Sequence, residues 1–181
     1  MSSLSIAALC VGAVFIVLYI PALVAPEATR RAVLAFPRSS IAAYALTAVD
    51  LIWVMVLILG ADLGRFEHLK PWVYAAGPVS FFLLNRYMEE LLAPRALGGL
   101  FLLAAAPILN AARWHDSPAR LLLTTIVYIA VIKGILFVLS PYRFRHLAEI
   151  WIKNEARLRA GALAMIGIGA LLIVFALTLY R

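Results

Sequence analysis

Stretches of about twenty apolar residues recur along the chain, and they leave few folds open to it. The clearest cover residues 5–24, 41–61, 121–140 and 160–180. A helix needs about 20 apolar residues to cross the hydrocarbon core of a bilayer. The chain is 65% hydrophobic and 14% charged, with a mean hydropathy of +1.00, whereas soluble domains are about 25% charged. The sequence therefore predicts an all-α, polytopic integral membrane protein that forms one transmembrane domain over residues 1–181.

The middle of the chain is harder to divide into spans. Residues 71–92 begin as an apolar stretch, and residues 96–112 are short for a span. The first of these stretches ends in a polar cluster of Asn85, Arg86, Glu89 and Glu90. Either both stretches cross the bilayer, which gives six transmembrane helices, or one is re-entrant, which gives five.

The charges of the loops favour six helices. Residues 25–40 carry three arginines and one glutamate, and residues 141–159 carry five basic residues and two glutamates. Residues 62–70 carry two charges of each sign. Because loops rich in Lys and Arg stay in the cytoplasm, both basic loops should lie there, which requires an even number of crossings between them. We therefore expect six spans and both termini on the non-cytoplasmic side. Five spans would export one basic loop.

The two basic loops resemble each other at an offset of 115 residues. Pro26, Arg30, Phe36 and Arg38 recur as Pro141, Arg145, Trp151 and Lys153. Short amphipathic helices lying in the membrane interface have this pattern of basic and apolar residues with an aromatic at headgroup level. We expect two such segments to contact anionic lipid headgroups through Arg30, Arg31, Arg38, Arg143, Arg145 and Lys153. The similarity either reflects an old hairpin duplication or the composition common to membrane boundaries.

Asp50 lies in the middle of the stretch 41–61, where an ionisable group costs about 2.5–3.5 kcal/mol on insertion scales. Such residues usually face the bundle interior and have a partner. Lys133 has a matching depth in the stretch 121–140 if the chain has six spans. We therefore predict an intramembrane charge pair, Asp50 with Lys133. It would be either a static pair that fixes helix order or a proton or ion relay. Alternatively, Asp50 is unpaired, protonated and hydrogen-bonded to a neighbour such as Thr47.

The polar cluster at residues 85–90 has two interpretations. Arg86 precedes Glu89 and Glu90 by three and four residues, a spacing that allows ion pairs within one helix. Paired carboxylates can also bind cations or shuttle protons. The plainer interpretation is a solvated helix end.

Motifs for catalysis and for cofactors are missing from the sequence. A single cysteine, Cys10, excludes an intrachain disulfide and a cysteine-based metal site. His68, His115 and His146 lie in loops or at their edges, whereas haem b between helices needs histidines that face one another within spans. No phosphate-binding loop, dinucleotide fingerprint or hydrolase motif occurs. We expect no enzymatic activity, no cofactor, no metal and no nucleic-acid partner.

These observations favour a non-catalytic membrane subunit within a larger membrane protein complex. The loops are short, and small residues that let helices approach closely recur at Gly98, Gly99, Gly161 and Gly167. The alternative is a small proton- or ion-coupled carrier that uses Asp50 and Lys133, and a third is a membrane enzyme acting on lipid or quinone. Arginine outnumbers lysine thirteen to three, which suggests a GC-rich bacterium and hence a bacterial inner membrane.

Overall fold

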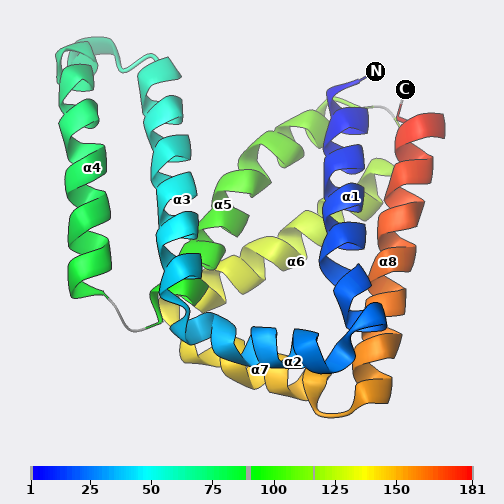
Figure 1. Ribbon diagram of the computed structural model, residues 1–181. Helices are drawn as coiled ribbons and strands as arrows, with labels where there is room; N and C mark the ends of the chain where they lie inside the picture. The colour runs from blue at the N-terminus through cyan, green and yellow to red at the C-terminus, as the bar shows by residue number, and fades with distance from the viewer. Residues whose placement is uncertain (1, 89–90, 116, 181) are drawn as a thin grey trace.

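The computed structural model describes residues 2–88, 91–115 and 117–180, and this part of the chain is helical with no strand. Six long helices run between its two ends (Figure 1). They are α1 (Ser3–Val24), α3 (Ser40–Gly60), α4 (Lys70–Tyr87), α5 (Leu92–Arg113), α6 (Arg120–Leu139) and α8 (Glu155–Thr178). The shorter elements are α2 (Pro26–Ala35), α7 (Tyr142–Ile152) and the 3-10 segments η1 (Phe36–Arg38) and η2 (Gly64–Leu69). The predicted all-α fold is confirmed.

Five of the long helices, all except α4, are long and apolar enough to cross a membrane. The protein is therefore multi-pass by length and composition. Helix α4 has 18 residues and includes Lys70, Asn85 and Arg86, which lower its hydropathy. It nevertheless runs antiparallel beside α3 and returns the chain to the end where α5 begins (Figure 1). The count of six spans remains a prediction.

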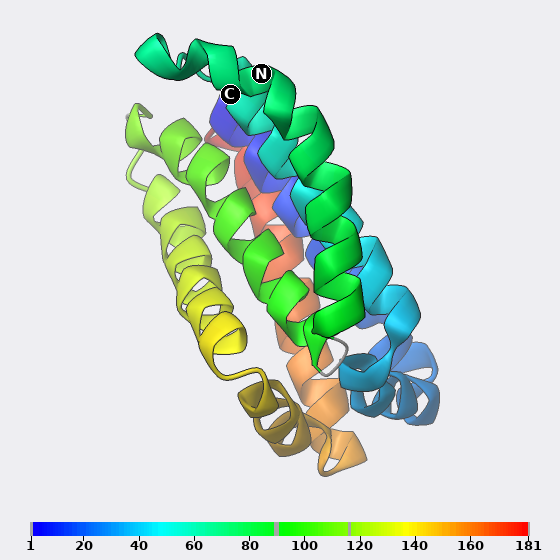
Figure 2. The ribbon, with the colours of Figure 1, turned by 90° about the vertical axis from the view of Figure 1, so that its left-hand side faces the viewer.

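The two short helices α2 and α7 lie side by side across one end of the bundle (Figures 1 and 2). Phe36, which follows α2 directly in η1, packs against Phe144 of α7, with ring centroids 5.1 Å apart. The two basic loops therefore share one end of the molecule, as the sequence predicted. We call this the basic end.

Glycines bring the helices into close contact within the chain. A methyl group built on Gly12 of α1 would lie 2.6 Å from the carbonyl oxygen of Gly169 on α8. One built on Gly98 of α5 would lie 2.7 Å from the carbonyl oxygen of Gly134 on α6. Backbones that approach this closely leave no room for a side chain, so these glycines serve packing inside this chain.

The largest buried core lies at the end opposite the basic end and joins α1, α5, α6 and α8. It includes the fully buried Leu4, Leu123, Leu172 and Tyr180. A hydrogen bond also connects the C-terminal end of the chain to the residues just before α6: the hydroxyl of Tyr180 donates to the carbonyl of Ala119 at 2.6 Å. The hairpin of α3 and α4 lies outside this core and is attached through α5.

Candidate functional site: a polar seam and a basic groove

Three buried side-chain oxygens lack a hydrogen-bond partner among the described residues. They are Oγ1 of Thr47, Oδ1 of Asp50 and Oδ1 of Asn85. Thr47 and Asp50 lie three residues apart on α3 and so share a helix face, and Asn85 lies in the last turn of α4. A buried polar group without a partner costs about 1–3 kcal/mol. All three lie on α3 and α4, which pack against each other, and this makes the hairpin a candidate functional site.

Asp50 packs against the backbone of α5. A methyl group built on Gly99 would lie 2.8 Å from Oδ2 of Asp50, so a larger residue at position 99 would require the carboxylate to shift. Gly99 lets the carboxylate approach α5 closely and offers it no side-chain partner. The Asp50 carboxylate can therefore accept a proton or bind a cation without first losing an ionic partner within the described chain.

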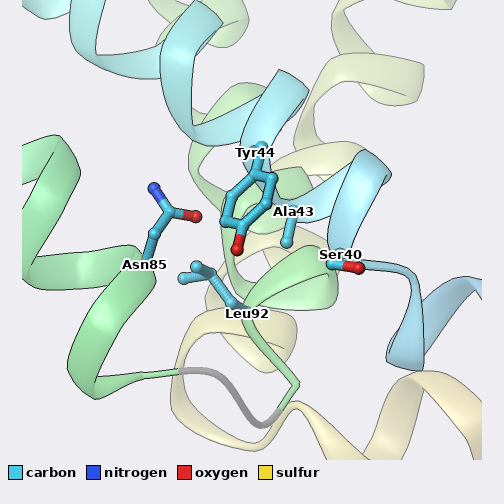
Figure 3. A pocket seen from close by; sticks show the side chains of 5 residues that line it. All are labelled: Ser40, Ala43, Tyr44, Asn85 and Leu92. Atoms are coloured by element: carbon cyan, nitrogen blue, oxygen red, sulfur yellow. The ribbon is translucent and has the colours of Figure 1, made fainter.

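A cavity of about 240 Å³ lies next to one of these residues, Asn85, toward the basic end. It is lined by Ser40, Ala43, Tyr44, Asn85 and Leu92. Asn85 is only 9% exposed, and its amide nitrogen donates to the carbonyl of Phe81 at 2.8 Å. Its free oxygen therefore faces the other way, and Figure 3 shows it directed toward Tyr44.

We group the polar residues of the cavity with the unpartnered residues of α3 and call the set the polar seam: Ser40, Tyr44, Thr47, Asp50 and Asn85. Along α3 the set extends from the first residue of the helix to its middle, about 15 Å at 1.5 Å per residue. Its groups are oxygen acceptors and hydroxyls, which suit a proton, water or a small cation. No group of three or more His, Cys, Asp or Glu residues that could hold a metal ion occurs in the described part of the chain.

The structure does not bring Asp50 and Lys133 together. Helix α5 packs against both α3 and α6, with Gly99 against Asp50 and Gly98 against Gly134. Lys133 is exposed on α6. Among the ion pairs of the described residues, none joins Asp50 to Lys133. Thr47 does not bond to Asp50 either, because its hydroxyl oxygen has no partner.

The predicted polar cluster at the end of α4 is only partly described. Asn85 belongs to the polar seam, and Arg86 is exposed on the last turn of α4. Glu89 and Glu90 lie outside the described residues. The two interpretations of the cluster therefore both stay open.

A second cavity, about 510 Å³ in volume, lies between α2 and α7 at the basic end. We call it the basic groove. It is lined by Arg30, Leu34, Arg145, His146, Glu149, Ile150, Ile152 and Lys153. Nε of Arg145 donates to Oε1 of Glu149 at 2.8 Å. Three of the six predicted headgroup contacts, Arg30, Arg145 and Lys153, thus meet in one place.

The other three predicted headgroup contacts lie elsewhere on the same end. Arg31, Arg38 and Arg143 are exposed and do not line the basic groove. Nε of Arg31 donates to the carbonyl of Glu27 in its own helix. Half of the predicted headgroup contacts therefore line the basic groove, and the other half are exposed outside it.

Protein-family models, curated proteins and solved structures gave no match to this chain. The features of the chain that point to a function are the polar seam, the basic groove and the exposed helix faces. Sequence reasoning singled out Asp50, Asn85 and the bases of the groove but missed Ser40 and Tyr44. Their signal was the spacing of Ser40, Tyr44, Thr47 and Asp50, which places one polar face on an apolar helix.

Proposed function

We propose that the chain is a non-catalytic subunit of a larger membrane protein complex, with α4 as the helix that its partner covers. The observation that carries this proposal is the position of α4. Of the six long helices, α4 is the one that is not long and apolar enough to be identified as a membrane span from length and composition. It nevertheless stands at the edge of the molecule and packs mainly on α3 (Figure 1).

The exposed aromatic side chains of α4 favour contact with another protein in addition to contact with lipid. Trp72 and Tyr87, near the two ends of α4, fit the aromatic belts found at both membrane interfaces. Tyr74 and Phe82 lie further inside the helix and are 64% and 66% exposed. Large aromatic side chains are enriched at protein interfaces, where a few of them supply most of the binding energy.

Purification of the full chain from its native membrane in mild detergent tests this proposal. We expect it to co-migrate with other chains at a fixed ratio. Tyr74→Ala/Phe82→Ala should abolish the co-migration, because two aromatic contacts cost about 2 kcal/mol or more each at an interface. The matched control is Val17→Ala/Leu18→Ala on the exposed face of α1, which should keep the ratio. Purification of the wild-type chain as a stable single species would contradict the proposal.

A second candidate function, a small proton- or ion-coupled carrier, is favoured by the polar seam. An acidic group at mid-membrane with an unpartnered oxygen is typical of proton and ion pathways. The seam contains Asp50 but not Lys133, so this candidate rests on Asp50 alone.

We further propose that the basic end lies at the cytoplasmic face of a bacterial inner membrane and that α4 is the sixth span. The proposal rests on the bases of both loops and on the rule that such loops remain inside. In a Cys10→Ala background, cysteines at positions 38 and 153 should react with a membrane-impermeant reagent only from the cytoplasmic side. Cysteines at positions 64 and 115 should react only from outside. Reaction of positions 38 and 153 from opposite faces would disprove this topology.

A further inference from the structure

We propose that the basic groove binds one anionic phospholipid, with its phosphate held between Arg30 and Arg145. The two arginines come from different helices, α2 and α7, and line the same cavity. They also occupy equivalent positions of the sequence repeat. The two similar loops thus supply one base each to a single site.

The chemistry of the groove is that of a phosphate site with an apolar floor. Arg30, Arg145 and Lys153 face one acid, Glu149, so the groove keeps an excess of positive charge. Glu149 bonds Arg145 through Nε at 2.8 Å, which orients the guanidinium while its Nη groups remain donors. Arginine is the preferred residue for phosphate because its planar fork can donate two parallel hydrogen bonds.

The apolar lining and the place of the groove favour a lipid over a free phosphate ion. Leu34, Ile150 and Ile152 line the same cavity as the bases. A lipid has acyl chains that can pack against these side chains, whereas a phosphate ion has no apolar group. Helices α2 and α7 lie across the ends of the long helices (Figures 1 and 2), where the headgroups of a bilayer would be. The volume of about 510 Å³ falls within the usual range of ligand sites.

A charge-matched comparison tests the site. The groove variant Arg30→Gln/Arg145→Gln and the control Arg31→Gln/Arg143→Gln remove the same charge from the same two helices. Each full-length chain is purified in a zwitterionic detergent, and phosphatidylglycerol is titrated in. We expect a saturable adduct of one lipid per wild-type chain by native mass spectrometry, with a matching rise in melting temperature. The groove variant should bind about thirtyfold more weakly, and the control should bind like the wild type.

Several outcomes would overturn the proposal. Equal weakening in both variants would mean diffuse attraction to the basic end. Stabilisation by inorganic phosphate without any lipid adduct would mean a site for a soluble anion. If the groove variant does not fold, Arg30→Lys/Arg145→Lys keeps the charge but loses the forks. It should bind several-fold more weakly than Arg31→Lys/Arg143→Lys, and equal binding of these two lysine variants would disprove the phosphate clamp.

Discussion

Gly169→Ala is expected to separate α1 from α8 and to cost about 1–3 kcal/mol of stability, the usual range for overpacking. A methyl group on Gly169 would lie 2.8 Å from the carbonyl oxygen of Gly12 and 3.1 Å from Cβ of Phe15. Neither atom is the flexible end of a side chain, so the helices themselves must move. Leucine at the same position should cost more than alanine.

The control for this substitution lies two residues away on the same helix. A methyl group on Gly167 meets no atom within 4 Å. Gly167→Ala should therefore keep or raise the melting temperature, because alanine favours a helix over glycine by about 1 kcal/mol. Thermal unfolding in detergent measures both variants, and equal melting temperatures would show that the α1–α8 contact is looser than described.

Asp50→Asn is expected to leave the protein at least as stable as the wild type. Its shape is nearly unchanged against Gly99, and it replaces an ionisable group that has no ionic partner in the described chain with a neutral amide. Loss of one member of a buried ion pair would instead cost about 3–5 kcal/mol. If the protein is a carrier, the same variant should lose proton or cation flux in proteoliposomes completely.

The double-mutant cycle of Asp50→Asn and Lys133→Met separates these possibilities. Because α5 stands between the two residues, we expect additive stability changes, within about 0.3–0.5 kcal/mol. Recovery of stability in the double variant would show that Asp50 and Lys133 meet, in conflict with the structure. Normal flux in stable Asp50→Asn would remove the carrier from consideration and leave the subunit.

Hydropathy predicts the apolar part of a helix that crosses the membrane, whereas capping residues determine the residue at which the helix begins. The stretch 41–61 corresponds closely to α3, whose first turn is capped by Ser39 through a hydrogen bond from the amide of Ala42 at 3.2 Å. The stretch predicted at 160–180 corresponds to α8, which begins earlier, at Glu155, because Asn154 caps it. Helix α5 begins at Leu92, directly after Leu91 with φ of 58°, rather than at residue 96.

The candidate site was harder to predict, because a sequence gives the depth of a residue but not the order of helices around a bundle. The depths of Asp50 and Lys133 match, yet the close contacts of α5 with both neighbours keep the two apart. Loop charge, in contrast, placed both basic loops at one end without knowledge of helix order. The convergence of Arg30 and Arg145 depends on how α2 packs against α7, which no local pattern encodes.

The close packing of α1 against α8 has a consequence for biogenesis. The ribosome makes α1 long before its main neighbour, α8, and Leu4 and Ala8 of α1 belong to the same core as Leu172 and Ala176 of α8. The face of α1 that contains Gly12 therefore lacks its main neighbour until α8 has been made. A chain terminated before α8 would leave that face of α1 without its main neighbour.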